Sequence, residues 1–157
     1  MLLLYFYYLH LYYSVIVLLP NSVFIKKSAE IIENGGISEL KEIAINGDKQ
    51  FILVEGQDKE KPFCLFLHGG PGSPFPYGVS ARTLYPEITE NCVAVYYDQR
   101  GSGKSYNNEL SVTTMNLSQF TEDANHIVDY IREHYQQEKN LYHWSILWYD
   151  NWYSISG

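Results

Sequence analysis

The chain has 157 residues, of which 18 are acidic and 11 are basic, so its formal charge at neutral pH is −7. This length suits one domain with enough chain to bury a core. The acidic balance argues against nucleic-acid binding, which needs a basic face. The two cysteines, Cys64 and Cys92, are too few for a disulfide framework, and no cluster of cysteine and histidine has the spacing of a zinc site. We therefore expect no metal site.

The two ends of the chain differ in composition from its middle. The first 13 residues contain six aromatic side chains, and the last 17 contain six more, including all three tryptophans. No residue before Lys26 is charged, and after Lys139 only Asp150 is charged. This distribution predicts a charged central region of ordinary composition between two atypical ends.

Residues 1–20 form a nearly uninterrupted apolar and aromatic run, which is long enough to cross a bilayer as a helix. We interpret this run as an apolar N-terminal helix that anchors the chain in a membrane. A signal sequence is an alternative, although the positive charge and the small-residue cleavage site that it would need are not evident. A non-physiological N-terminus is a third interpretation. Lys26 and Lys27 follow the run, so the positive-inside tendency predicts a cytoplasmic location for the rest of the chain, with secretion as the alternative.

The central region begins with a predicted hairpin. We expect residues 21–38 to form a linker. The residues of Lys41–Asn46 alternate in polarity as a half-buried strand does, and the Asn-Gly-Asp turn that follows leads into Phe51–Val54. Phe63–Leu67 and Cys92–Tyr97 are continuous apolar runs, which are typical of strands buried on both faces of a parallel sheet.

Two helices are predicted among these strands. A short crossover helix fits Val79–Thr89, and a longer helix fits Ser118–Tyr135, capped by its first residue or by Asn116. A hairpin followed by this alternation predicts an α/β sandwich that begins with an antiparallel pair. Asp123 and His126 lie three apart on the longer helix, and we interpret them as an exposed face rather than as a pair. The apolar face of that helix comprises Phe120, Ala124, Ile127, Val128 and Ile131.

A glycine-rich loop follows the first buried strand, at the point where open α/β sheets bind their ligands. It reads His68-Gly-Gly-Pro-Gly72, with three glycines in five residues. Glycines there allow a sharp turn and expose backbone N–H groups to a bound anion. An ordinary glycine–proline turn is the alternative, but the position after a buried strand favours a function.

A second loop, Asp98-Gln-Arg-Gly-Ser-Gly-Lys-Ser105, follows the next buried strand. Its last three residues imitate a phosphate-binding P-loop, but that motif needs a glycine where Asp98 stands. We therefore reject a P-loop. We expect Asp98 and Arg100 to form a structural network that shapes the loop beneath the active site. The residues assigned to this structural loop motif are Asp98, Gln99, Arg100, Gly101, Gly103 and Ser105.

The two motifs, in this order and about 30 residues apart, resemble the α/β-hydrolase fold, specifically its proline iminopeptidase-like branch. The resemblance covers residues 39–141 and implies the N-terminal half of such a sheet, with an antiparallel hairpin and then parallel strands joined by crossover helices. It implies that the amides near Gly69 and Gly70 form half of an oxyanion hole, and that His68, Pro71 and Gly72 shape the loop. It also implies hydrolysis of peptides or small esters through a Ser-His-Asp triad, without a cofactor, releasing an N-terminal proline or another small residue.

The sequence departs from the family where the nucleophile elbow G-x-S-x-G is expected. Ser145 has His143 and Leu147 at the two positions that require glycine. Ser154 fails the same test. The Ser, Asp and His of the triad are thus not found, so we assign no catalytic residue and expect no hydrolase turnover.

Residues 142–157 are interpreted as an aberrant aromatic tail, which a frameshift, a truncation or a wrongly predicted gene end would explain. Trp144, Trp148 and Trp152 are spaced by four, so a binding stripe on a helix is the alternative. The competing class of function is non-enzymatic: a short membrane-anchored protein, or a remnant that binds a partner. The sequence does not predict the oligomeric state.

Overall fold

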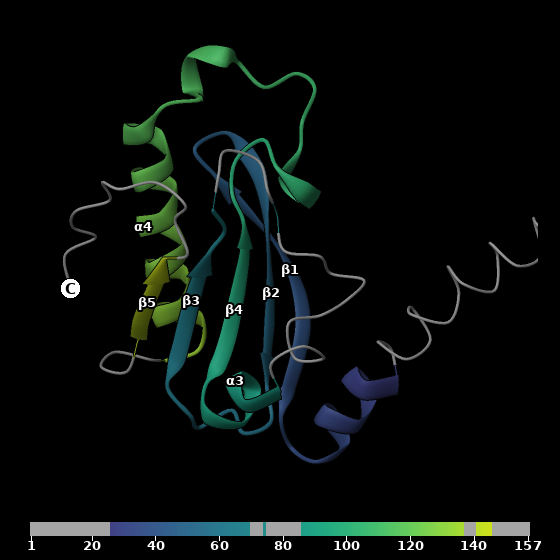
Figure 1. Ribbon diagram of the computed structural model, residues 1–157. Coiled ribbons are helices and arrows are strands. Elements are labelled where there is room, and N and C mark those ends of the chain that lie inside the picture. The colour runs from purple at the N-terminus through teal and green to yellow at the C-terminus, as the bar shows by residue number, and fades with distance from the viewer. Residues whose placement is uncertain (1–25, 70–73, 75–85, 137–140, 146–157) are drawn as a thin grey trace, which may run out of the picture.

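The computed structural model describes residues 26–69, 74, 86–136 and 141–145 of the chain (Figure 1). Residues 26–33 are helical. The segment 21–38, which was expected to be a linker, therefore contains a helix and the first two residues of a strand. The remaining elements, in chain order, are β1 (Ile37–Ile45), β2 (Asp48–Gly56), β3 (Phe63–Leu67), α3 (Pro86–Asn91), β4 (Val93–Asp98), two 3-10 turns (Gly103–Ser105 and Val112–Thr114), α4 (Leu117–His134) and β5 (Leu141–Ser145).

The strands form one mixed sheet in the order β1-β2-β4-β3-β5 (Figure 1). β1 pairs with β2 and β2 with β4 in antiparallel orientation, whereas β3 runs parallel to both β4 and β5. Every residue of β3 and β4 is buried, as the continuous apolar runs predicted. The predicted α/β class and its opening hairpin are confirmed.

The β1–β2 hairpin closes through a two-residue turn. Ile45 pairs with Asp48, and the two residues between them, Asn46 and Gly47, have φ angles of 47° and 78°. Positive φ at both central positions is the geometry that matches the right-handed twist of the flanking strands, and Asn-Gly is the pair that adopts it most readily. The predicted turn is therefore confirmed.

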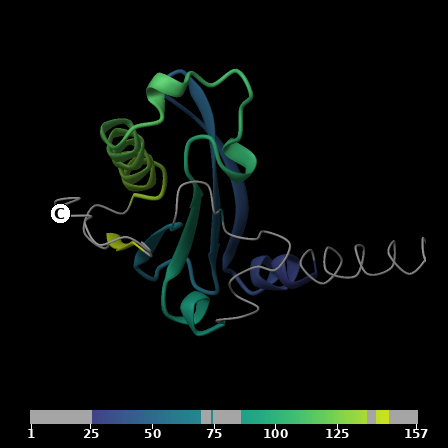
Figure 2. The ribbon, with the colours of Figure 1, turned by 45° about the horizontal axis from the view of Figure 1, so that its top comes forward.

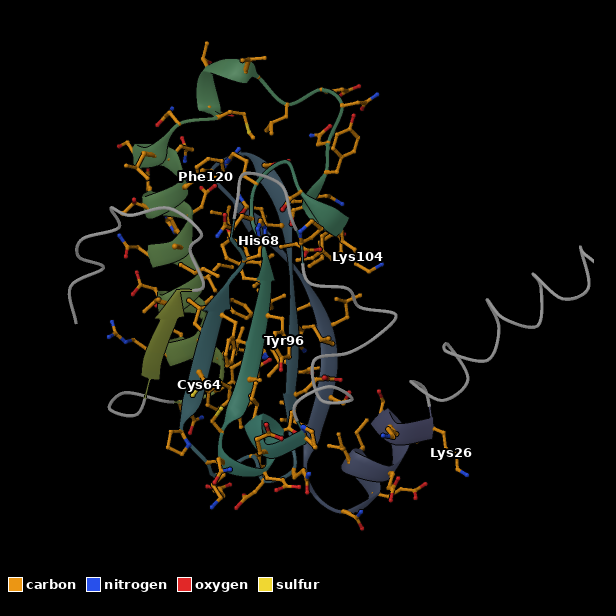
Figure 3. The ribbon with its side chains drawn as sticks, in the orientation of Figure 1. Lys26, Cys64, His68, Tyr96, Lys104 and Phe120 are labelled. Atoms are coloured by element: carbon orange, nitrogen blue, oxygen red, sulfur yellow. The ribbon has the colours of Figure 1, made fainter. Side chains whose placement is uncertain are left out.

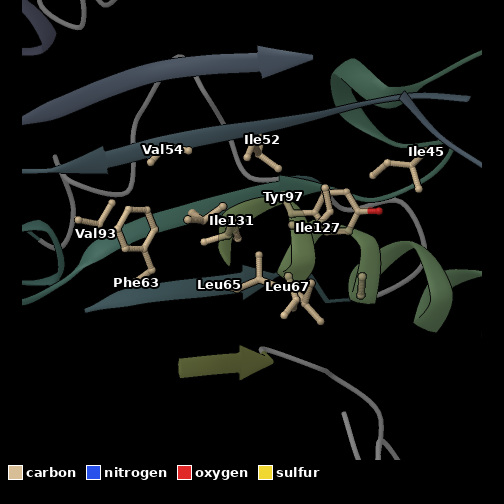
Figure 4. Packing of buried hydrophobic residues seen from close by; sticks show 13 residues of the cluster. Ile45, Ile52, Val54, Phe63, Leu65, Leu67, Val93, Tyr97, Ile127 and Ile131 are labelled. Atoms are coloured by element: carbon tan, nitrogen blue, oxygen red, sulfur yellow. The ribbon is translucent and has the colours of Figure 1, made fainter. Parts of the chain in front are cut away.

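Helix α4 covers one face of the sheet (Figure 2). Its N-cap is Asn116, whose side-chain Oδ1 accepts a hydrogen bond from the backbone nitrogen of Gln119 at 3.0 Å. Four of the five residues predicted for its apolar face are buried, and Phe120 is half-buried. They pack on side chains from β2, β3 and β4 (Figure 4). The buried members of this cluster, called here the α4-face core, are Ile45, Ile52, Val54, Phe63, Leu65, Leu67, Val93, Val95, Tyr97, Ala124, Ile127, Val128 and Ile131.

The opposite face of the sheet carries a smaller apolar cluster, against which Ile88 of α3 packs. This helix is the described part of the crossover predicted over Val79–Thr89; it begins at Pro86, and residues 75–85 lie outside the described part of the chain. The buried members of this cluster, called here the α3-face cluster, are Leu53, Cys64, Phe66, Cys92, Ala94 and Tyr96.

The predictions for the two ends of the chain have different outcomes. Residues 1–20 lie outside the described residues, so the membrane segment stays a prediction. Within the part that the structure describes, no helix is long and apolar enough to cross a membrane. At the other end, β5 pairs Leu141 with Phe63 and Ser145 with Leu67. The sheet thus extends four residues into the segment 142–157 that was interpreted as an aberrant tail.

Candidate functional site

The two glycine-containing loops leave the sheet side by side. β3 and β4 are adjacent and parallel, with Leu67 paired to Tyr97, so both loops begin at the same edge. Carboxyl ends of neighbouring strands are where open α/β sheets place their ligands. Figure 3 shows His68 at this edge and Lys104 on the neighbouring loop. Gly69 is half-buried, whereas Gly70, Pro71 and Gly72 lie outside the described residues.

His68 links the two loops. Its side chain is buried, and its Nε2 lies 2.8 Å from Ser102 Oγ and 3.2 Å from the backbone nitrogen of Gln99. The side-chain amide of Gln99 donates to the backbone oxygen of His68 at 3.4 Å. Burial lowers the pKa of His68, although a hydrogen bond with the backbone of Gly69 partly offsets this effect. A neutral imidazole at this place joins the loop after β3 to the loop after β4.

The loop after β4 folds around the carboxylate of Asp98. Asp98 Oδ2 accepts a hydrogen bond from the backbone nitrogen of Lys104 at 2.7 Å. Gly103 has φ +51°, and a Cβ atom added there would collide with that carboxylate. Ser105 Oγ donates to the backbone oxygen of Asp98 at 2.6 Å and accepts from the backbone nitrogen of Phe51 at 2.9 Å. These contacts fix the loop to β2 and β4. The backbone N–H of Lys104, which in a P-loop would bind a phosphate, donates here to Asp98.

The side chain of Arg100 extends from the same loop to helix α4. Its Nε and Nη2 donate to Asp123 Oδ2 and Oδ1 at 2.6 and 3.0 Å, and its Nη1 lies 3.7 Å from Asp48 Oδ2. Arg100 is 3% exposed and Asp123 is 0% exposed. Bidentate geometry of this kind gives the strongest form of ion pair. The predicted structural network thus has two parts, because Asp98 holds the loop backbone while Arg100 fastens the loop to α4.

Asp123 is the centre of a buried polar network. Besides the two bonds from Arg100, its carboxylate accepts bonds from Asn46 Nδ2 at 2.7 Å, Gln50 Nε2 at 2.8 Å and Gln119 Nε2 at 3.0 Å. The Oε1 of Gln50 in turn accepts from the hydroxyl of Tyr97. Burial raises the pKa of Asp123, but these hydrogen bonds, led by that from Arg100, outweigh burial and hold the pKa below its ordinary value. The carboxylate therefore stays ionised.

The expectation that Asp123 lies on an exposed helix face was wrong. Only His126 is exposed, and the partner of Asp123 is Arg100. The partners Asn46, Gln50 and Arg100 come from segments distant in sequence, so helical spacing could not reveal them. One signal was available: Asp123 lies next to Ala124 and four residues before Ile127, on the apolar face, where a carboxylate requires a buried cation.

Within the described ranges, no group of three or more histidine, cysteine, aspartate or glutamate side chains is placed to hold a metal ion. What the structure describes after β3 is His68 and Gly69, and the loop after β4 contacts His68. The oxyanion-hole role of the amides near Gly69 and Gly70 stays a prediction.

Two comparisons identify this arrangement. By structure, the chain is similar to a proline iminopeptidase-related protein from Thermus thermophilus, with a TM-score of 0.53 and 24% identity over 68% of this chain and 36% of that one. That likeness shows the α/β-hydrolase fold. An epoxide hydrolase from Vigna radiata also matches, with a TM-score of 0.48 and 26% identity over 60% of this chain and 28% of that one. No protein-family model matches the chain.

By sequence, the chain is 35% identical over 109 residues to "Probable aminopeptidase YbaC" of Bacillus subtilis (strain 168), which corresponds to 69% of this chain and 34% of that protein. Together with the paired loops, this similarity supports an α/β-hydrolase chain that is like the proline iminopeptidases. It spans about a third of the length of that relative.

Proposed function

We propose that this chain supplies the oxyanion-loop part of a serine hydrolase that removes an N-terminal residue, proline or another small one, from peptides. The similarity to a probable aminopeptidase supports this reaction class, and the likeness to a proline iminopeptidase-related protein supports the fold that carries it. In this proposal the backbone amides near Gly69 and Gly70 donate to the oxyanion of the tetrahedral intermediate.

The observation that carries the proposal is the link between the two loops through His68. An oxyanion hole works because its donors are held in place before the charge develops. The contacts of the buried His68 ring with Ser102 and with the backbone of Gln99 fix the residue that immediately precedes Gly69. His68 and Ser102 are therefore positioning residues, and neither is proposed as the catalytic base.

We further propose that the chain does not hydrolyse substrates on its own. Its sequence contains no G-x-S-x-G, and β5, the strand that would lead to the elbow, ends at Ser145 between His143 and Leu147. Glycines at those two positions relieve the crowding of the sharp turn that exposes the nucleophile. The whole-enzyme reaction thus needs residues that this sequence does not provide.

The direct test is turnover by the purified full chain. We expect no release of naphthylamine from a prolyl-naphthylamide and no hydrolysis of a nitrophenyl ester above the rate of a matched Ser145→Ala variant. Hydrolysis that the Ser145→Ala change abolishes would contradict the proposed inactivity and would make Ser145 the nucleophile. Hydrolysis that both proteins share and that a serine-directed phosphonate blocks would point to another serine.

A further inference from the structure

The only two cysteines of the chain lie together on the α3-face of the sheet. Cys64 pairs with Ala94 in the register of β3 and β4, and Cys92 stands two residues before Ala94. Because side chains alternate between faces, Cys64 and Cys92 are diagonal neighbours on one face. Both belong to the α3-face cluster, and each is 8% exposed. Figure 3 shows Cys64 on β3, toward the end of the sheet opposite His68.

The two thiols are reduced and interact with each other. Neither forms a disulfide. Contact with the Cys92 thiol lowers the pKa of Cys64 despite its burial, whereas the same contact and burial raise the pKa of Cys92. The thiolate is the reactive form of cysteine, so these opposite directions favour Cys64 over Cys92 as the attacking thiol. The proposed hydrolase chemistry uses neither residue.

We propose that Cys64 and Cys92 form a redox-sensitive pair that a hydroperoxide oxidises to a disulfide. In the first step the Cys64 sulfur attacks one peroxide oxygen, the O–O bond breaks, and hydrogen peroxide yields one water and a sulfenic acid on Cys64. In the second step the Cys92 sulfur attacks the Cys64 sulfur, the S–S bond forms, and the sulfenic oxygen leaves as a second water. The two thiols together lose two electrons and two protons, and the peroxide is reduced to two waters.

Formation of this bond requires the two Cα atoms to lie within the range of a disulfide. A disulfide joins Cα atoms that are about 4.4–6.8 Å apart, which is shorter than many diagonal pairs in a sheet. Cys92 lies just outside β4, at the junction with α3, where its amide bonds to the backbone oxygen of Ile88 at 2.9 Å. The proposal therefore requires this junction to move Cys92 toward Cys64 when the bond forms. The disulfide would then tie β3 covalently to the start of β4.

The test uses the full-length chain and hydrogen peroxide as the oxidant. After oxidation, the protein is alkylated under denaturing conditions and its intact mass is measured. We expect both thiols to resist alkylation, a mass loss of about two hydrogens, and full recovery of both thiols after treatment with a reductant. A tryptic peptide that links the segments around Cys64 and Cys92 identifies the bond.

The single variants Cys64→Ser and Cys92→Ser are the matched controls. In Cys92→Ser we expect Cys64 to progress to sulfinic acid, because no thiol captures its sulfenic acid, and in Cys64→Ser we expect slower oxidation of the remaining thiol. The proposal is overturned if wild-type Cys64 becomes sulfinic acid as fast as in Cys92→Ser. It is also overturned if the intramolecular bond forms equally fast in urea, since the fold would then not bring the thiols together. Neither outcome bears on the proposed hydrolase function.

Discussion

The two faces of the sheet are held by different means. The α4-face core combines a large apolar cluster with a buried ion pair, in which Arg100 from the loop after β4 meets Asp123 of α4. Among the residues that the structure describes, the α3-face cluster has fewer buried members, and α3 contributes Ile88 to it. Both faces belong to the same central strands. Because Arg100 joins the loop after β4 to α4, we expect the position of this loop, and with it the candidate site, to depend on α4 more than on α3.

Removal of the carboxylate at the centre of the polar network should have the largest effect. Asp123→Ala removes the bidentate partner of the buried Arg100 guanidinium and leaves it only the longer contact with Asp48, and breaking a buried pair in this way costs about 3–5 kcal/mol. Asp129→Ala on the same helix is the control, because Asp129 is 66% exposed in its side chain and its pair with Arg132 is worth less than about 1 kcal/mol. Urea unfolding measures both. Equal losses in the two variants would refute the structural role assigned to Asp123.

Apolar truncations on the two faces compare the clusters directly. Ile127→Ala removes a fully buried side chain from the α4-face core, and we expect a loss of about 3 kcal/mol in the free energy of unfolding. Leu53→Ala removes a buried side chain from the α3-face cluster, where fewer apolar partners surround the cavity, and we expect about 2 kcal/mol. A larger loss of unfolding free energy in Leu53→Ala than in Ile127→Ala would contradict the view that the α4-face core contributes more to stability.

A pair of glycine variants separates backbone strain from steric conflict in the loop after β4. At Gly103, an added methyl group collides with Asp98 and φ is positive, so Gly103→Ala should cost about 2 kcal/mol. Gly47 also has positive φ, but its Cβ position is open, so Gly47→Ala should cost about 1 kcal/mol. Both free energies come from the same urea titration. Equal costs would mean that Asp98 does not hold the loop.

The smallest expected effect is the change in the free energy of unfolding with pH, which reports specifically on the ionisation of Asp123. The pKa of Asp123 is below its ordinary value near 3.8 in the folded state, so the unfolded chain binds more protons at acidic pH. The stabilisation is complete above that ordinary value and is lost as the pH falls through the lower, folded value. Asp123→Asn should therefore be less stable than the wild type at neutral pH, and the difference should shrink in acid. A difference that stays constant with pH would contradict the ionised carboxylate.

Much of this fold could be predicted from local patterns. Period-two alternation, the Asn46-Gly47 turn and the continuous apolar runs predicted the hairpin and the buried strands, because strand geometry depends on neighbouring residues. The apolar stripe of α4 predicted its buried face in the same way. The strand order was not predicted, since local patterns do not say which strands become neighbours.

The buried network could not be predicted in the same way. The position of Asp123 on the apolar face of α4 indicated that it needs a buried partner, but not which one. Its partners Asn46, Gln50 and Arg100 meet it only after the hairpin, β4 and α4 have packed together. The proximity of Cys64 and Cys92 likewise depends on the parallel register of β3 and β4. Such contacts depend on tertiary packing, which overrides helix and strand periodicity.

The central claim, that this chain carries a functional oxyanion loop, is tested most directly in a chimera. The segment of the Bacillus subtilis relative that aligns with this chain would be replaced by the matching residues of this chain, and kcat on prolyl-naphthylamide would be measured with and without Gly69→Pro, which removes one backbone donor. We expect the chimera to hydrolyse the substrate and Gly69→Pro to lower kcat by about 10²–10³-fold, with KM less affected. A folded chimera without activity, or one whose kcat is unchanged by Gly69→Pro, would contradict the claim.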